Sequence, residues 1–401
     1  MDGEKFFGKE CFHVMLFFYL CIVFGNDMST TASAPFIYWA QRMQELKRIV
    51  FVVNPISGTS GKKMILKQIE KLIDKDKFAY DIVQTQYAGH ATEIARGAAN
   101  RGVDIVCAIG GDGTVNETAR ALVHTDTSLA IIPCGSGNGL ARHLHIPMDA
   151  IRAIKLINEA EPQLMDYGLI NLHPFFCTCG VGLDAFISQK FAEAGKRGFL
   201  TYVENILQNA LSYNPETYEI ELVDEESEKQ VYEALLITCA NASQWGNNAF
   251  IAPQASVRDG LMDVTIIEPF TLLEVPQLAL QLMNGTIDKS GRIKSFRCKN
   301  LLIKRSKPGA IHYDGDPVET GENIEVSLIR NGLSCMCPTD EGVMDMSETI
   351  QNQLVEHFNE MYLRSQEIQE NIQNQNRRIM QLNKDIVNRL SRIGRRRKDE
   401  E

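Results

Sequence analysis

The sequence predicts two domains of different class: an α/β domain with a mostly parallel sheet, followed by an antiparallel β-sandwich domain. Short β-branched runs alternate with helical patterns from Ile49 to Pro133, and strand patterns separated by turns replace this alternation after about Asp166. An apolar heptad repeat that begins near Leu354 predicts a long helix or coiled coil as a C-terminal tail. The 401 residues are enough for two domains and a tail.

The α/β domain is assigned to residues 43–166, with part of 327–340 closing its sheet. Apolar runs without alternation predict strands that are buried on both faces, and amphipathic patterns between them predict covering helices. The expected strands are Ile49–Asn54, Tyr80–Gln84, Asp104–Ile109 and Leu129–Pro133, and the expected helices are Lys62–Asp74, His90–Arg101 and Thr118–Val123.

The β-rich domain is assigned to residues 167–326. Its expected strands are Phe175–Gly182, Tyr218–Val223, Tyr232–Ala240, Met262–Ile267, Ser295–Ile303 and Ile324–Leu328. A helical pattern over Gly195–Tyr213 interrupts them and carries an apolar stripe beside Lys196 and Arg197. A helix packed on the core and a lid that touches a membrane both fit this stripe.

The two ends of the chain differ from the domains. In residues 1–42, the apolar run Val14–Phe24 is shorter than the roughly 20 residues that span a bilayer. A dispensable extension, a weak membrane anchor and an upstream misreading of the start remain open. In residues 345–401, nine of twelve heptad seam positions are apolar, which predicts homo-oligomerisation through a coiled coil or a single helix folded against the body.

Composition narrows the choice of partners and compartment. The formal net charge of -10 argues against a general nucleic-acid binder, because such proteins need a broad basic surface. The ten cysteines are scattered, which predicts reduced thiols in a cytoplasmic protein rather than a disulfide framework. Any anionic partner is therefore expected to meet a local basic patch.

Three strand ends carry glycine or polar loops. Gly110–Thr114 follows the third expected strand, Gly135–Gly139 follows the fourth, and Asn54–Gly58 follows the first. The carboxyl ends of parallel strands meet at one edge of a sheet, where such folds bind ligands. Glycines let a polyphosphate approach the backbone, and the N–H groups at a helix start face its charge. The loops therefore predict a nucleotide site.

Asp112 is the acidic residue of the Gly110–Thr114 loop. A carboxylate does not bind phosphate directly, so we expect it to act through Mg²⁺, which bridges phosphate oxygens to carboxylates. A tight turn with a solvated aspartate is the alternative.

Six segments of the chain form a recognisable series. They are NPISG at 54–58, GGDGTVNE at 110–117, PCGSGN at 133–138, Gly182-Leu183-Asp184-Ala185, DGLMD at 259–263, and Asp314-Gly315-Asp316. In this order they resemble the diacylglycerol kinase catalytic-domain family over roughly residues 48–340. This family includes bacterial diacylglycerol kinases, related lipid kinases and sphingosine kinases. NAD kinases share a GGDG loop and form a more distant alternative.

The resemblance implies an α/β nucleotide-binding domain of the NAD kinase/diacylglycerol kinase type and a β-sandwich domain that binds lipid. It assigns Asp184 to the lipid head group, with a helix N-cap as the alternative. A structural Mg²⁺ is implied at Asp259 and the main-chain carbonyls of Ser256 and Leu261, with an ordinary Asp-Gly turn as the alternative. The residues that it places around ATP are Asn54, Pro55, Ser57, Gly58, Thr85, Gly110, Gly111, Asp112, Gly113, Thr114, Val115, Asn116, Glu117, Gly135, Ser136 and Asn138.

The general base departs from the family pattern. The family has Asp-Gly-Glu with the glutamate as proton acceptor, whereas this chain has Asp316, which is one methylene shorter. A base must lie within about 3 Å of the proton or one water away, so a backbone shift, a water or the neighbouring Asp314 would have to make up the reach.

The implied activity is Mg²⁺-dependent transfer of the γ-phosphoryl group of ATP to a hydroxyl of a lipid, such as diacylglycerol or a sphingoid base, by a cytoplasmic protein peripherally associated with the membrane. A catalytically weak regulator that binds nucleotide or lipid is the alternative. The apolar strands of the second domain do not select among the lipids.

Overall fold

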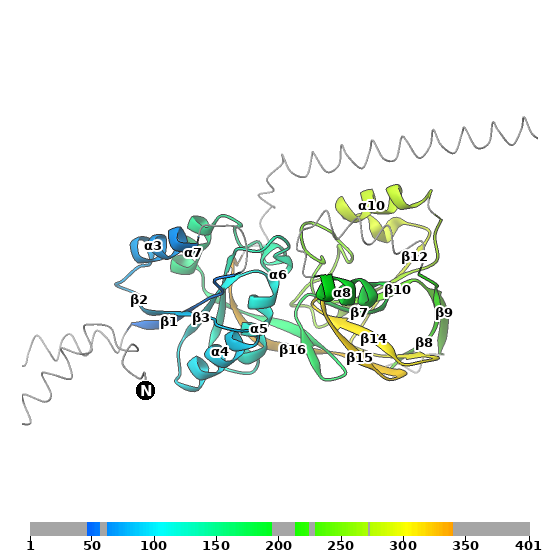
Figure 1. Ribbon diagram of the computed structural model, residues 1–401, viewed down its shortest axis with the longest axis horizontal. Helices are drawn as coiled ribbons and strands as arrows, with labels where there is room; N and C mark the ends of the chain where they lie inside the picture. The colour runs from blue at the N-terminus through cyan, green and yellow to red at the C-terminus, as the bar shows by residue number, and fades with distance from the viewer. Residues whose placement is uncertain (1–45, 57–61, 195–212, 224–228, 272, 340–401) are drawn as a thin grey trace, which may run out of the picture. The chain divides into compact units, whose positions relative to one another are not determined.

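A computed structural model describes residues 46–56, 62–194, 213–223, 229–271 and 273–339 (Figure 1). The chain divides into a unit of residues 1–47 and a unit of residues 48–401, and the description below concerns the second. The N-terminal extension, nearly all of the expected Gly195–Tyr213 helix and the heptad tail lie outside the described residues, so the structure does not support a coiled coil. Within the described residues, no helix is both long and apolar enough to cross a membrane.

The N-terminal α/β lobe, called the nucleotide lobe after the site that its sequence predicts, is built on a sheet in the order β2-β1-β3-β4. These strands are β1 (Lys47–Val53), β2 (Phe78–Gln84), β3 (Ile105–Gly110) and β4 (Ser128–Pro133). β3 pairs in parallel with both β1 and β4, and its register sets Gly110 opposite Pro133. Every residue of β3 and β4 is buried, which explains their unbroken apolar sequences.

Helices cover both faces of this sheet (Figure 1). On one side lie α3 (Lys62–Leu72) and α7 (Ala150–Glu159), and on the other lie α4 (His90–Asn100) and α5 (Asp112–Leu122). α5 begins at Asp112, six residues before the expected start at Thr118, because the glycine loop itself forms the first turn. Glycine lowers helix propensity, which hid this turn in the sequence. A short helix, α6 (Gly139–His143), follows the second glycine loop.

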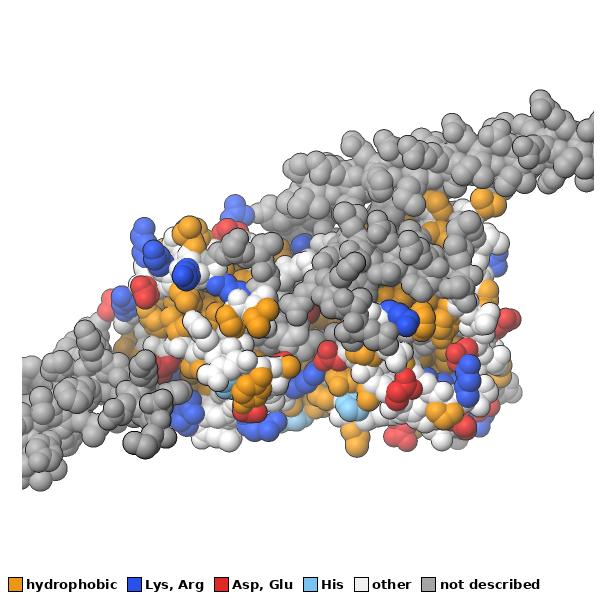
Figure 2. All heavy atoms as spheres, viewed as in Figure 1, with side chains coloured by type: hydrophobic (Ala, Val, Ile, Leu, Met, Phe, Trp, Pro, Cys, Tyr) orange, Lys and Arg blue, Asp and Glu red, His pale blue; other side chains and the backbone are white. Residues whose placement is uncertain are grey.

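Charged side chains of both signs are distributed over the described surface in Figure 2. Basic side chains gather over α3, which carries Lys62, Lys63, Lys67 and Lys71. The acidic chain therefore has a local basic surface on its nucleotide lobe.

The β lobe consists of two sheets that enclose an apolar core, which includes Phe175, Tyr218 and Ile303. One sheet has the order β12-β11-β10-β7-β14-β15, and the other continues the nucleotide sheet as β4-β16-β13-β8-β9, with β5 on β16 and β6 on β5. α8 (Leu183–Ala194) packs on β14 and β15, and α10 (Val275–Met283) lies near the 3-10 turn Ile287–Lys289. The strands are β5 (Pro162–Ile170), β6 (His173–Phe175), β7 (Thr178–Gly182), β8 (Glu216–Leu222), β9 (Gln230–Ala234), β10 (Leu236–Ala240), β11 (Met262–Ile267), β12 (Ile293–Cys298), β13 (Asn300–Arg305), β14 (Gly309–Tyr313), β15 (Asp316–Thr320) and β16 (Asn323–Met336).

Two of the expected strands contain a corner. The chain passes from β9 to β10 at Leu235, and from β12 to β13 at Lys299, and each passage moves it from one sheet to the other. Strands that switch sheets make the corners of a sandwich. The apolar pattern continues through both corners because both sheets face the same core, so the sequence predicted single strands.

Strand β16 joins the two lobes. It pairs antiparallel with β13, and near its end Cys335 pairs in parallel with Leu129 of β4. The register of β16 with β5 shifts between Ile329 and Leu333. The sequence predicted only Ile324–Leu328 as strand and a contribution from 327–340 to the first sheet; in the structure one strand does both.

Candidate functional site

The two glycine loops touch through their backbones. A Cβ atom added to Gly135 would lie 2.6 Å from the Cα of Gly111 and 2.9 Å from Oδ1 of Asn138. The main-chain N–H of Cys134 also donates to the carbonyl of Gly110 at 2.7 Å. Glycine is therefore required at this crossing because no side chain fits between the loops.

Asp112 fastens the second loop to the first. Its Oδ2 accepts the N–H of Asn138 at 2.8 Å, and its Oδ1 accepts the N–H of Gly139 at 2.7 Å. The alternative of a merely solvated aspartate is therefore wrong. Each carboxylate oxygen can accept a second partner, so the donor set still fits a Mg²⁺ ion carried in with a nucleotide.

Asn138 closes the second loop from within. Its Nδ2 donates to the carbonyl of Gly135 at 2.8 Å, while its Oδ1 accepts the N–H of Gly135 at 3.0 Å. The side chain is buried and the backbone has a φ of 51°, a region in which asparagine is favoured. Ser136 lies exposed at the tip of this loop, where its hydroxyl can reach a ligand.

The end of β1 leads into the same region. Asn54 donates from Nδ2 to Oγ1 of the buried Thr114 at 3.1 Å, and Lys62 contacts the carbonyl of Asn54. Thr85 is buried beside the end of β1 and donates its N–H to Val53 at 2.8 Å. Pro55 is exposed, and Ser57 and Gly58 lie outside the described residues.

The remaining residues of the GGDGTVNE segment belong to the body of α5. Val115 and Asn116 are buried, and Oε2 of Glu117 accepts the N–H of Ala91 at 3.2 Å, near the start of α4. Gly113 is exposed in the first turn of α5. These contacts hold α5 in place, so Val115, Asn116 and Glu117 stabilise the helix that carries the first glycine loop.

A loop of the β lobe covers the second glycine loop. The N–H of Asn247 donates to the carbonyl of Gly137 at 3.0 Å, and Arg142 donates from Nε to the same carbonyl at 2.9 Å. Burial lowers the pKa of Arg142, and the charge of Asp112 opposes this shift. Sequence reasoning missed this loop, although Gly246-Asn247-Asn248 is a turn-forming run that follows a strand.

The segment Asp314-Gly315-Asp316 forms the turn of a hairpin. Asp314 and Gly315 have φ values of 50° and 86°, and they connect Tyr313 and Asp316, which are paired across β14 and β15. Two consecutive positive φ values are typical of the type I′ turn, for which Asp-Gly is a favoured pair.

Asp314 anchors this turn to the segment between β6 and β7. Its carboxylate accepts the N–H groups of Phe176, Cys177 and Thr178 at 2.8, 2.8 and 3.1 Å. Burial raises the pKa of Asp314 to about 6, against the opposing effect of these three donors. Asp314 is thus occupied by the main chain and does not replace Asp316 as an exposed base.

Asp316 is the exposed acid of the hairpin, with 53% of its side chain accessible. Nη2 of Arg120 lies 2.9 Å from its Oδ2. The guanidinium of Arg120 also lies 4.7 Å from the ring centroid of Tyr313, and that ring stacks on His173 at 4.7 Å. Arg120, which lies eight residues after Asp112 on α5, was not among the residues that the sequence predicted for the site.

Asp184 is buried at the start of α8. Its Oδ2 accepts the hydroxyl of Thr238 at 2.7 Å and lies 2.8 Å from Nε2 of His312. The carboxylate is only 2% exposed, so it is shielded from a lipid head group in this conformation. The N-cap alternative is wrong, because α8 begins at Leu183 and Asp184 lies within its first turn.

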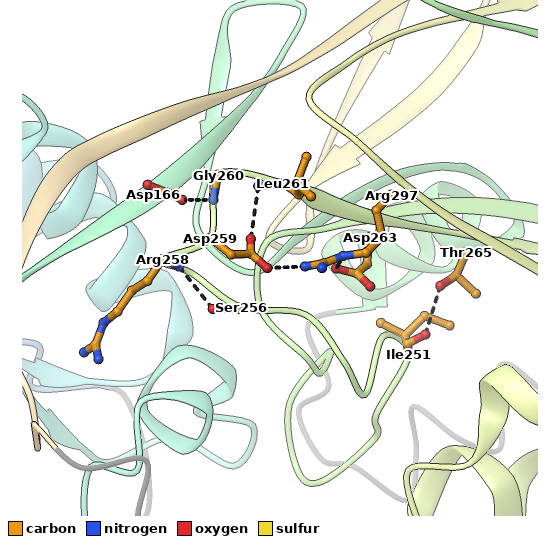
Figure 3. A network of polar contacts seen from close by, with 10 residues as sticks. All are labelled: Asp166, Ile251, Ser256, Arg258, Asp259, Gly260, Leu261, Asp263, Thr265 and Arg297. Atoms are coloured by element: carbon orange, nitrogen blue, oxygen red, sulfur yellow. Dashed lines mark hydrogen bonds and ion pairs between the residues drawn. The ribbon is translucent and has the colours of Figure 1, made fainter. Parts of the chain in front are cut away.

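The residues of the implied structural metal site lie in the loop before β11 (Figure 3). Asp259 accepts the N–H of Leu261 at 3.0 Å through Oδ1 and contacts Arg297 through Oδ2. The hydroxyl of Ser256 accepts the N–H of Arg258 at 3.3 Å. Gly260 has a φ of 80°, so the Asp-Gly turn is present.

Replacing Gly135 with alanine should separate the glycine loops, because its Cβ would meet the backbone of Gly111. We expect the free energy of unfolding to fall by about 1–3 kcal/mol, the usual cost of overpacking. Urea unfolding measures this. Gly113→Ala is the matched control, because a Cβ there meets nothing within 4 Å. Equal stability of the two variants would contradict the contact.

Asp314 should make stability fall as the pH rises through the weakly acidic range. With a pKa of about 6 in the folded state and about 3.9 in the unfolded state, the folded protein holds a proton that the unfolded chain releases. Between about pH 4 and 6, wild type should lose about 2–3 kcal/mol relative to Asp314→Asn. Unfolding curves of both proteins across this range test it. A stability of wild type that instead rises with pH relative to Asp314→Asn would show that the three N–H donors dominate.

Comparison with known proteins agrees with this arrangement. Residues 48–170 match the domain model described as "Diacylglycerol kinase catalytic domain", and residues 177–327 match "YegS C-terminal NAD kinase beta sandwich-like domain". A Bacillus subtilis protein named "Diacylglycerol kinase" is 27% identical over 276 residues, which cover 68% of this chain and 90% of that protein. A Chromohalobacter salexigens protein named "Probable lipid kinase YegS-like" is 26% identical over 294 residues, 71% of this chain and 93% of that protein.

The fold is also shared with a solved structure. The crystal structure of a diacylglycerol kinase from Bacillus anthracis gives a TM-score of 0.57 at 20% identity, over 74% of this chain and 98% of the other. The two matched domains follow one another over the nucleotide lobe and the β lobe. Residues 48–170 are therefore a diacylglycerol kinase catalytic domain, and residues 177–327 are the β-sandwich domain that follows it.

Proposed function

We propose that this chain is an ATP-dependent lipid kinase that transfers the γ-phosphoryl group to a hydroxyl of a lipid, such as diacylglycerol or a sphingoid base. The main support is the position of helix α5. Helix α5 begins at the glycine loop and, through Arg120, holds the exposed carboxylate of Asp316 on the β lobe. The nucleotide loop and the candidate base are thus linked by a single rigid element.

The nucleotide end of the site would hold the phosphates. Glycines 111 and 135 expose backbone at the contact of the two loops, and Asn54, Thr114 and Ser136 supply polar groups around it. Asp112 would hold Mg²⁺ through the free lone pairs of its oxygens. When bound, Mg²⁺ neutralises charge on the phosphate oxygens.

The acceptor end would be Asp316. The lipid hydroxyl gives its proton to this carboxylate as its oxygen forms a bond to the γ-phosphorus, and the bond from that phosphorus to the bridging oxygen breaks to leave ADP. Eight residues of helix separate Asp112 from Arg120, a rise of about 12 Å. The phosphates and the acceptor must therefore lie along α5 for Asp316 to reach the hydroxyl.

Arg120 compensates for the short side chain of Asp316 by fixing its position. Its guanidinium is held over Tyr313, whose ring also stacks on His173, so the carboxylate is oriented by a stack of three side chains. Orienting a reacting group in this way can contribute a large part of a rate enhancement.

We also propose that the reaction takes place at a membrane. The lipid substrate places the protein at a membrane surface, as a cytoplasmic protein with peripheral association. The local basic surface over α3 is consistent with an anionic surface as partner. Homo-oligomerisation through the heptad tail is a further part of the proposal.

The deciding experiment incubates the purified full chain with γ-labelled ATP and separate vesicles that contain diacylglycerol or sphingosine. A labelled lipid phosphate and lipid-dependent ATP consumption are expected. Binding of ATP and lipid without labelled product would instead favour the regulator.

Asp316→Asn should remove the proton acceptor and leave ATP affinity near that of wild type. We expect a loss of roughly 10²- to 10⁴-fold in kcat, the usual contribution of a general base. Steady-state kinetics with saturating ATP, together with an ATP titration, separates the two effects. Asp316→Glu, which restores the family residue, should retain activity if the site accommodates the extra methylene. Wild-type turnover of Asp316→Asn would rule out this base.

Arg120→Gln should lower kcat by about 10²-fold with little change in KM for ATP, because it misplaces the base without touching the nucleotide loop. If Arg120 acts through Asp316, the double variant with Asp316→Asn should be no slower than Asp316→Asn alone. Multiplied effects in this double-mutant cycle would mean that Arg120 acts independently. Arg120→Lys, which keeps the charge but not the planar fork, serves as the conservative variant.

A further inference from the structure

The turn at Asp259, where family resemblance implies a structural Mg²⁺, already contains a cation. Nη2 of Arg297 contacts Oδ2 of Asp259, and Nε of the same guanidinium lies 3.1 Å from Oδ2 of Asp263 (Figure 3). One arginine side chain therefore bridges two carboxylates. The planar guanidinium suits this geometry because its donors form a rigid fork.

The position of Arg297 follows from the pairing of the strands. Asp263 of β11 and Arg297 of β12 are direct partners in the antiparallel register, so their side chains lie on the same face of the sheet. Asp259 stands four residues before Asp263, at the turn that leads into β11. Burial raises the pKa of Asp263, and the charge of Arg297 opposes that shift. The guanidinium thus stabilises a carboxylate that the fold has partly removed from water.

The turn itself is fixed by neutral donors of the main chain. The buried Asp166 accepts the N–H of Gly260 at 2.8 Å and the N–H of Asn331 at 2.7 Å. This ties the turn to β5 and β16. Asp259 in turn accepts the N–H of Leu261. The conformation that a metal ion would have to organise is therefore already specified by hydrogen bonds.

A divalent cation does not fit this donor set as it stands. Mg²⁺ requires oxygen ligands at about 2.0–2.1 Å in octahedral geometry. The outer oxygen of Asp259 is paired with the positive charge of Arg297, which would repel the ion, whereas the partners of Asp112 are neutral N–H groups. A second guanidinium, that of Arg330, lies beside Gly260, since a Cβ added there would be 2.8 Å from its Nε. Arg297 thus faces the carboxylates of Asp259 and Asp263, with Arg330 beside the same turn, and an added Mg²⁺ would meet like charge.

We propose that Arg297 takes the place of the structural metal ion, so that the β lobe of this chain folds and stays folded without a divalent cation at Asp259. Arg258, the basic residue nearest in sequence, does not serve this purpose, because its side chain points away toward Cys337, with Nη2 3.2 Å from Sγ (Figure 3). This inference is independent of the catalytic proposal.

Thermal unfolding of the full chain without ATP or lipid tests it. Wild type should have the same midpoint in EDTA and in excess MgCl₂. Arg297→Gln should unfold about 2–4 °C lower in EDTA, the shift expected for about 1 kcal/mol in a unit of roughly 150–250 residues, which is the size range of the β lobe. It should recover part of this loss in MgCl₂ or CaCl₂, because two carboxylates then face each other without a cation. The double variant Arg297→Gln/Asp259→Asn should lose that recovery.

Lys294→Gln is the matched control, since Lys294 is an exposed cation on the same strand whose nearest carboxylate, Glu268, is 4.0 Å away. It should change the midpoint less than Arg297→Gln. Should Arg297→Gln fail to fold, Arg297→Lys, which keeps the charge, should fold and remain indifferent to metal. A saturable rise of the wild-type midpoint with MgCl₂ that Asp259→Asn abolishes would overturn the proposal, and so would full stability of Arg297→Gln.

Discussion

Strand β16 belongs to both lobes, and its position decides which loops can meet. It pairs with β13 in the β lobe and with β4 in the nucleotide lobe. β4 is the strand that leads into the second glycine loop. Because hydrogen bonds between strands fix register, the β lobe is held where its loop at Asn247 reaches Gly137 and its hairpin reaches Arg120. The proposed site therefore depends on β16, the strand that the two lobes share.

Main-chain N–H groups hold several carboxylates of this acidic protein. Asp112, Asp166 and Asp314 each accept two or three of them, and each ties one loop to another. Hydrogen bonds to an ionised acceptor are stronger than those between neutral groups, which suits them to fixing turns. Asp316 is different, since it is exposed and pairs with the side chain of Arg120. That contrast separates the acids that fix the loops from the proposed proton acceptor.

Guanidinium groups connect parts of the molecule that hydrogen-bonded strands do not. Arg120 links α5 to the hairpin, Arg142 links α6 to the loop of the β lobe, and Arg297 links β12 to the turn at Asp259. Arginine is suited to such links because it remains charged and donates in several directions. Two of these three arginines lie where the sequence predicted something else. Near Asp316, a backbone shift, a water or Asp314 was expected to make up the reach of the base, and at Asp259 a metal ion was expected.

The sequence by itself determined the order of strands and helices from β1 to β4, the glycine loops and the resemblance to the family, but β5, β14 and β15 were not among the expected strands. Gly110–Thr114 and Gly135–Gly139 could be predicted because their chemistry is local. A glycine that follows a buried strand allows a close approach to the backbone wherever that strand lies in the sheet. The corners at Leu235 and Lys299 could not be predicted, because an apolar run has the same sequence pattern whether it stays in one sheet or crosses to the other. Arg120, Arg297 and the buried state of Asp184 were decided only by tertiary structure. Their partners, Asp316, Asp259 and His312, are between 38 and 196 residues away along the chain, and pairing over such separations depends on strand register and helix packing rather than on local pattern.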